Sequence, residues 1–140
     1  MNQNPELVKA LNHMLEQEHA CSIRYATHAV TVTGPYADSV AARLKEIAGD
    51  ELRHAAELRQ RIAELGGTPS MQVNVADLKQ AKDLKEILAI NIEEEKQAID
   101  SYLKIFRTIK PEDALLYETI QDIIKDEQEH LQELETLQGR

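Results

Sequence analysis

Residues 51–54 read ELRH and residues 127–130 read EQEH, so in both segments a histidine follows a glutamate by three positions. The two segments lie 76 residues apart. Two single glutamates, Glu18 and Glu94, are also 76 residues apart, and each precedes its Glu-x-x-His segment by 33. The chain therefore carries one arrangement of acids and imidazoles twice. Side chains three positions apart share one face of a helix, so each segment can present two ligands to the same point.

Apolar residues recur at helical spacing over four long segments. The first segment ends at Gly34–Pro35, the second ends at Gly66–Gly67, and Pro111 separates the third from the fourth. Glycine readily adopts the left-handed backbone conformation in which many helices end. Proline cannot continue a helix, because it has no backbone N–H to donate. We expect helices at about 5–33, 39–65, 83–109 and 112–138.

The lengths of the connections predict how these helices are arranged. The short links near residues 35 and 111 make each flanking pair of helices an antiparallel hairpin. The long link between the second and third helices can span the bundle at about 3.3 Å per residue, which makes these two helices parallel. The expected fold is all-α, a four-helix bundle in up-down-down-up order with one long crossover. The length of this link also allows the second and third helices to be antiparallel, with a slack link between them.

Distances from the two turns place the six repeated residues at one height in such a bundle. Glu18 lies 17 residues before residue 35 and Glu51 lies 16 after it, and Glu94 and Glu127 repeat these distances about residue 111. Each also continues the inward apolar stripe of its helix. Burying four unpaired carboxylates costs several kcal/mol per charge, which two divalent cations offset. We therefore predict a dimetal site; a buried polar network without metal is the alternative. The predicted ligands are Glu18, Glu51, His54, Glu94, Glu127 and His130.

Several other polar residues lie near the predicted ligands in the sequence. Glu16 and His19 form a third Glu-x-x-His pair, but Glu16 is roughly 200° around the helix from Glu18, which indicates a solvated face. Glu95 is a candidate hydrogen-bond acceptor behind the ligands. Tyr25 lies seven residues after Glu18, so it is either a core residue or part of the site.

Composition and charge narrow the functional classes. A formal net charge of -9 repels nucleic acids and anionic membranes and attracts metal cations. No apolar run approaches the roughly 20 residues of a membrane span. Residues 1–11 lack the features of a secretory signal, and the single cysteine, Cys21, forms no disulfide within the chain. We expect a cytoplasmic protein that binds neither nucleic acid nor membranes.

At these residues the chain resembles a bacterioferritin, within the ferritin-like di-iron carboxylate superfamily. Two Glu-x-x-His motifs and two single glutamates in a four-helix bundle are the established signature of that superfamily. The resemblance implies a single ferritin-like domain over residues 1–140. It also implies two iron ions per chain bridged by Glu51 and Glu127, with terminal ligands Glu18 and His54 at one ion and Glu94 and His130 at the other.

The resemblance has consequences for three further features. Tyr25 matches the family's tyrosine beside the di-iron centre and is the candidate catalytic residue. Bacterioferritins bind an intersubunit haem through a methionine directly after the first bridging glutamate. Leu52 occupies that position here, which argues against haem. The storage cage of the family has a short fifth helix, which this sequence lacks after the fourth expected helix. We therefore expect a homo-oligomer, either a 24-subunit shell or a smaller assembly.

The implied function is a ferroxidase that oxidises Fe(II) with O2 in iron storage or detoxification. Carboxylate and imidazole ligands suit manganese and zinc as well as iron, so ligand types alone leave the metal open. One alternative is a non-storing oxidase or peroxidase, rubrerythrin-like or manganese-catalase-like, that acts on peroxide or an organic substrate. Another is a metal-binding bundle without turnover.

Overall fold

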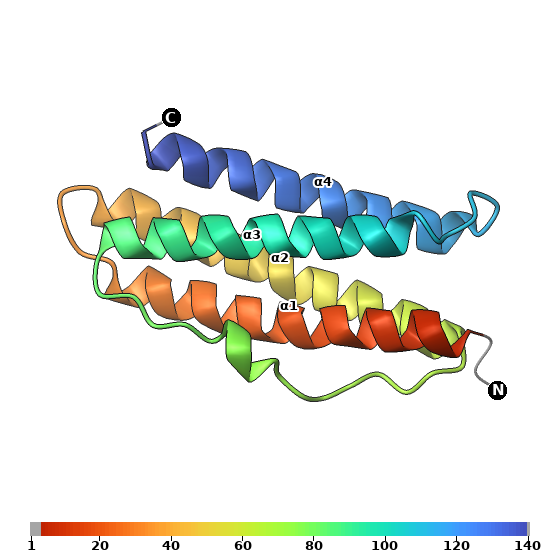
Figure 1. Ribbon diagram of the computed structural model, residues 1–140. Helices are drawn as coiled ribbons and strands as arrows, with labels where there is room; N and C mark the ends of the chain where they lie inside the picture. Colours follow the sequence, from red (N-terminus) through yellow and green to blue (C-terminus); the bar gives the residue numbers. More distant parts are fainter. Residues whose placement is uncertain (1–3, 140) are drawn as a thin grey trace.

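The computed structural model describes residues 4–139, which form four long helices joined by two short turns and one crossover (Figure 1). No strand occurs among these residues. The helix ends lie within three residues of the expected ones. Residues 1–3 and 140 of the expected single domain lie outside the described range. The helices are α1 Pro5–Thr31, α2 Ala37–Glu64, α3 Leu84–Phe106 and α4 Ala114–Leu137, and the crossover contains one 3-10 turn, η1, Val75–Asp77.

Local sequence explains where two of the helices begin and where one ends early. The side chain of Asn4 accepts a hydrogen bond at 3.2 Å from the backbone N–H three residues on, at the start of α1. Asp83 caps α3 in the same way at 2.9 Å. α3 ends at Phe106, earlier than the expected residue 109, because the chain tightens into a turn in which Ile109 N donates to Phe106 O at 3.1 Å.

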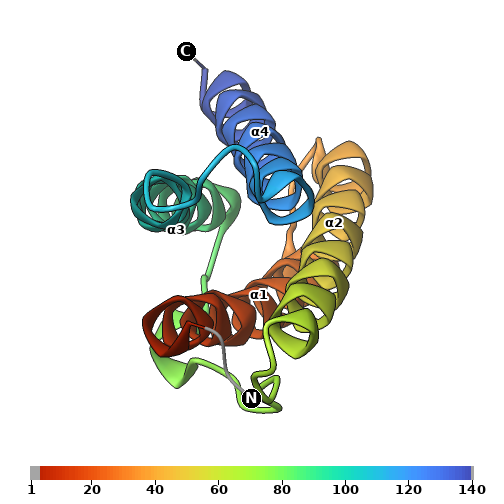
Figure 2. The ribbon, with the colours of Figure 1, turned by 90° about the vertical axis from the view of Figure 1, so that its right-hand side faces the viewer.

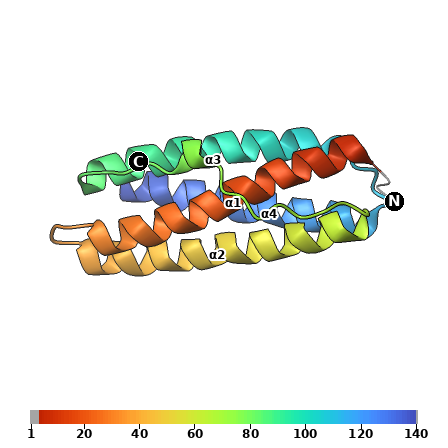
Figure 3. The same cartoon turned by 90° about the horizontal axis from the view of Figure 1, so that it is seen from below.

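The four helices are arranged as two antiparallel hairpins. α1 pairs with α2, and α3 pairs with α4 (Figure 1). The crossover runs back along the whole bundle from the end of α2 to the start of α3, so α2 and α3 are parallel. The crossover lies on the outer side of α1 (Figure 2; Figure 3). The all-α fold in up-down-down-up order with one long crossover is confirmed, and the slack antiparallel arrangement is excluded.

Polar residues on the outer face of α1 bind the crossover along its length. Each makes a hydrogen bond of 2.6–3.0 Å to residues 68–79. Glu16 and His19 are two of them, and the prediction that they lie on a solvated face is wrong, because the crossover half-buries both. The four helices alone would leave both side chains facing solvent. The five residues are Asn12, Glu16, His19, Arg24 and His28.

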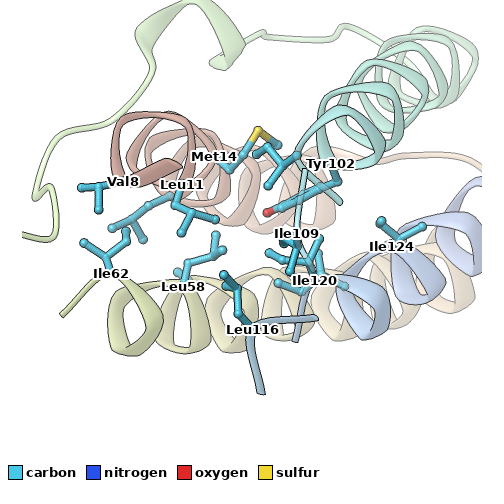
Figure 4. Packing of buried hydrophobic residues seen from close by; sticks show 14 residues of the cluster. Val8, Leu11, Met14, Leu58, Ile62, Tyr102, Ile109, Leu116, Ile120 and Ile124 are labelled. Atoms are coloured by element: carbon cyan, nitrogen blue, oxygen red, sulfur yellow. The ribbon is translucent and has the colours of Figure 1, made fainter. Parts of the chain in front are cut away.

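Two apolar clusters fill the bundle, and a polar layer separates them. One cluster, shown in Figure 4, contains fully buried Leu11, Leu58 and Ile120. The other, towards the opposite end, contains fully buried Ile47 and Leu134. Burying one such side chain contributes about 1.5–3 kcal/mol, so the two clusters stabilise the bundle on both sides of the polar layer.

Gly67, where the chain leaves α2, packs too closely on α1 for a larger residue. A Cβ atom at this position would lie 2.5 Å from Val8 Cγ1 and 3.2 Å from Ile62 Cγ2. Since valine is stiff at its first side-chain torsion, we expect Gly67→Ala to lower the free energy of unfolding by about 1–3 kcal/mol. Thermal and denaturant unfolding, followed by circular dichroism, measure this loss.

Gly49 supplies the matched control, because a Cβ atom there would meet nothing within 4 Å. Gly49→Ala should raise the free energy of unfolding by up to about 1 kcal/mol, since alanine is the better helix former. Adding Val8→Ala to Gly67→Ala should cost less than the two single losses combined, because the smaller side chain relieves the overlap. Equal melting temperatures for the two glycine variants would contradict the packing argument.

Candidate metal centre

The polar layer between the apolar clusters consists of six acidic and imidazole side chains from all four helices. Each of the six is at most 2% exposed. α1 and α3 supply one glutamate each, whereas α2 and α4 supply one glutamate and one histidine each. Water is therefore largely excluded from a place where four carboxylates meet. The six residues are Glu18, Glu51, His54, Glu95, Glu127 and His130.

Ligand atoms of these residues converge in two groups. In each group, one donor atom from each of four residues lies within 4.8 Å of the others. Both groups contain Glu51 and Glu127, so these two carboxylates lie between them. The His54 Nδ1 atom is 3.1 Å from Glu51 Oε1, and the His130 Nδ1 atom is 3.2 Å from Glu127 Oε1. The groups are Glu18, Glu51, His54 and Glu127, and Glu51, Glu95, Glu127 and His130.

Five of the six predicted ligands meet in this cluster, but Glu94 does not. Glu94 Oε1 lies 2.5 Å from Lys79 Nζ of the crossover, and Glu94 Oε2 lies 3.8 Å from an Arg24 guanidinium nitrogen. Glu95 takes the place expected of Glu94. α3 buries both glutamates, so its inward side spans more than the roughly 100° between adjacent residues. Of the adjacent pair, Glu95 lies in the cluster and the predicted Glu94 does not.

A second tyrosine contacts the cluster, and its spacing in the sequence favours Glu95 over Glu94. Tyr102 lies seven residues after Glu95, as Tyr25 lies seven after Glu18. The Tyr25 hydroxyl donates to Glu95 Oε1 at 2.8 Å, which places the candidate catalytic tyrosine against the cluster. The Tyr102 hydroxyl donates to Glu18 Oε2 at 2.5 Å. Tyr102 is not among the site residues predicted from the sequence, so this contact with the site was not expected.

Each histidine presents Nδ1 to the cluster and Nε2 to an aspartate of another helix. His54 Nε2 lies 2.8 Å from Asp126 Oδ2, and His130 Nε2 lies 2.8 Å from Asp50 Oδ2. An aspartate at Nε2 favours the tautomer that leaves Nδ1 free as a metal ligand. Each aspartate directly precedes a glutamate of the cluster, so the same short segments supply both ligands and their supports.

Burial and crowding perturb the proton equilibria of the cluster. Burial, together with the nearby Glu51 charge, raises the pKa of Glu18 to about 7 and that of Glu95 and Glu127 well above the usual range. Burial alone would lower the pKa of His54, but the adjacent Glu18 and Glu51 carboxylates outweigh it and raise that pKa to about 11. Burial opposes the ionisation of Glu51, yet close contact with His54 lowers its pKa overall. The cluster therefore holds extra protons at neutral pH.

The donor atoms fit two divalent metal ions. Among residues 4–139, ten buried side-chain polar atoms lack a hydrogen-bond partner, and seven of them belong to this cluster. All seven are carboxylate oxygens or histidine Nδ1 atoms, which are ligands for iron, manganese and zinc. Two divalent ions would add four positive charges to four ionised glutamates. A pair of cations would offset the otherwise unfavourable burial of these atoms.

The raised pKa values predict that the metal-free protein loses stability as pH rises. The pKa of Glu18 is about 7 in the folded protein, against an ordinary 4.5. Between these pH values the folded protein keeps a proton that the unfolded chain releases, so the free energy of unfolding falls as pH rises. Glu95 and Glu127 act in the same direction, and Glu51 acts in the opposite direction. The stability that protonated His54 contributes below pH 6.5 is lost as pH rises towards about 11.

We expect the melting temperature of the metal-free protein to fall between about pH 5 and about pH 8. A divalent ion such as Zn²⁺ should restore it, most strongly at the higher pH, because metal competes with protons for the same atoms. Calorimetric scans at several pH values, with and without Zn²⁺, measure both effects. A metal-free melting temperature that rises across this interval is the contrary result.

Comparison with known proteins identifies the class to which this bundle belongs. A family model described as a ferritin-like domain matches residues 8–140, and the chain belongs to the ferritin-like family. Bacterioferritin from Mycobacterium bovis is 26% identical over 137 residues, covering 97% of this chain and 86% of that protein. Bacterioferritin from Desulfovibrio desulfuricans is 32% identical over 93 residues, or 66% of this chain and 51% of that protein.

Solved structures agree with this assignment. A ferritin-like diiron-carboxylate protein from Bacillus anthracis superposes with a TM-score of 0.87 at 32% identity, covering 95% of both chains. A dodecameric thioferritin, the bacterioferritin-related protein from Bacteroides fragilis, gives 0.88 at 27% identity over 94% of this chain and 83% of its own. The resemblance to the bacterioferritins, within the ferritin-like di-iron superfamily, is confirmed.

Among residues 4–139, none of the helices combines the length and the apolar composition that a membrane-spanning helix needs.

Proposed function

We propose that this chain is a ferroxidase that oxidises Fe(II) with O2 at a dinuclear centre, in iron storage or detoxification. The observation that carries the proposal is the pair of four-residue groups sharing Glu51 and Glu127. A shared carboxylate holds two ions next to each other, as reactions that use two metal ions require. Glu51 and Glu127 would bridge the ions, with Glu18 and His54 terminal at one and Glu95 and His130 terminal at the other.

The protein's own groups would bind, orient and screen the reactants. Iron supplies the redox chemistry, since two Fe(II) give one electron each to one O2, which with two protons leaves as hydrogen peroxide. The apolar clusters on both sides keep bulk water away from the carboxylates. The carboxyl groups of Glu18, Glu95 and Glu127 would release their protons as cations bind, because their pKa values are raised in the metal-free protein. Tyr25 would hold Glu95 and lie beside the reacting ions.

The adjacent glutamates Glu94 and Glu95 offer a matched test of this centre. Anaerobic titration of the wild-type protein with Fe(II) should show two ions per chain, followed by rapid O2 consumption. Glu95→Gln should leave one tightly bound ion and slow oxidation by at least about 100-fold, because even the partners of metal ligands are worth about 10- to 100-fold. Glu94→Gln should still bind two ions and oxidise them, since Glu94 pairs with Lys79 and Arg24.

Stopped-flow absorbance and an oxygen electrode give the rates, and Glu93→Gln on the exposed face of α3 controls for the loss of one negative charge. Equal effects of Glu94→Gln and Glu95→Gln would reject the ligand assignment. Two tightly bound ions without O2 consumption would instead support a metal-binding bundle. Slow use of O2 with fast use of peroxide would support the peroxidase alternative.

We further propose a cytoplasmic homo-oligomer without haem. The related protein of Bacteroides fragilis is described as dodecameric, which supports an assembly of many copies. Leu52, where the resemblance would require a haem-binding methionine, has an apolar side chain with no ligand atom and is 59% exposed on α2. Light scattering of the native protein should give the mass of a closed assembly, for which 12 and 24 copies are the two family-based expectations. A stable monomer would contradict this proposal.

A further inference from the structure

Two hydrogen bonds cross between α1 and α3 in opposite directions at the centre. Tyr102 of α3 is fully buried, and its hydroxyl donates to Glu18 Oε2 of α1 at 2.5 Å. Tyr25 of α1 is also fully buried, and its hydroxyl donates to Glu95 Oε1 of α3 at 2.8 Å. Figure 4 shows the Tyr102 ring reaching from α3 towards α1. Each tyrosine therefore supports the glutamate of the other hairpin.

The two bonds leave each glutamate with one occupied and one free oxygen. Glu18 Oε1 and Glu95 Oε2 are buried and have no hydrogen-bond partner among residues 4–139. The two glutamates serve different four-residue groups, because Glu18 belongs to one group and Glu95 to the other. A phenol can hold one oxygen in this way without adding charge, since it donates a single proton.

We propose that Tyr102 is a positioning residue for one metal ion, as Tyr25 is for the other, and that this pair makes the two metal positions equivalent. Tyr102 holds Glu18 Oε2, the oxygen that lies 3.3 Å from His54 Nδ1. Without the hydroxyl, the carboxylate can turn, leave the ion or chelate it with both oxygens. The inference rests on the dinuclear centre of the proposed function, but it concerns how ions are held and not whether they are oxidised.

The contacts of the two histidines are a second observation that supports the equivalence of the two metal positions. The His54 and His130 Nε2 atoms both lie 2.8 Å from an aspartate oxygen of the opposite hairpin. The residues that support the ligands are therefore of the same type and at similar distance in both groups. Outer partners of this kind are worth about 10- to 100-fold in metal affinity. Loss of one tyrosine hydroxyl should weaken one position and leave the other unchanged.

Co(II) binding to the metal-free protein tests the proposal without any oxidation step. Calorimetry should show two Co(II) per wild-type chain with affinities equal to within about threefold, a spread too small to reflect a missing support. Tyr102→Phe and Tyr25→Phe should each weaken one of the two ions by about 10- to 100-fold, and the double variant should weaken both. The visible absorption of bound Co(II), which reports its coordination, should change for one ion in each single variant.

Two controls separate positioning from a general loss of stability. Tyr117→Phe removes a hydroxyl from a ring that packs on Phe106 away from the centre, and it should bind Co(II) as the wild type does. In the Glu95→Gln background the remaining ion belongs to Glu18 and His54. Tyr102→Phe should weaken that ion by the same factor as before, whereas Tyr25→Phe should leave it unchanged.

The outcomes distinguish this inference from the proposed function. Absence of Co(II) binding to the wild type would reject the dinuclear centre and this inference with it. Two normal ions in Tyr102→Phe would reject the positioning role and leave the centre standing. The proposal would be overturned if Tyr102→Phe lowered the affinity for both ions equally, or if Tyr25→Phe lowered the affinity for the remaining ion in the Glu95→Gln background. Either result would mean that the tyrosines stabilise the whole site and do not each position one glutamate.

Discussion

Burial of four glutamates at one height is the constraint on which the rest of this structure depends. Ionised carboxylates so close together and so far from water are strongly unfavourable, and the raised pKa values of Glu18, Glu95 and Glu127 express that cost. Apolar clusters on both sides isolate the layer and stabilise the bundle around it. Cations in place of the protons would make the layer itself favourable. The protein is therefore organised as two ordinary helical cores that hold a charged layer between them.

The support of this layer always comes from the opposite hairpin. Asp126 of α4 holds His54 of α2, and Tyr102 of α3 holds Glu18 of α1. The reverse pairs, Asp50 with His130 and Tyr25 with Glu95, complete an approximately symmetric set. Neither hairpin alone contains a ligand together with its support. The repeat in the sequence therefore becomes functional only when the two hairpins pack against each other.

The crossover contributes more than a connection between the hairpins. Its polar contacts with α1 occupy residues that would otherwise face solvent, and Lys79 reaches from it to Glu94. Arg24 lies fully buried between the crossover and α3, where its Nε donates to Asn91 Oδ1 at 2.8 Å. These contacts give Glu94 cationic neighbours of its own, outside the glutamate–histidine cluster. The crossover thus pairs with the one of the two adjacent glutamates that lies outside the cluster.

The sequence by itself determined the four helices, their order and five of the six clustered residues, because helical periodicity, turn residues and the 76-residue repeat are properties of the chain alone. Only the tertiary structure decided between Glu94 and Glu95, brought Tyr102 to Glu18 and buried Glu16 and His19 under the crossover. The reason is angular. Adjacent positions differ by about 100° on a helix, and α3 buries a face wide enough to include both glutamates, so the side that meets the other helices is set by packing and not by spacing.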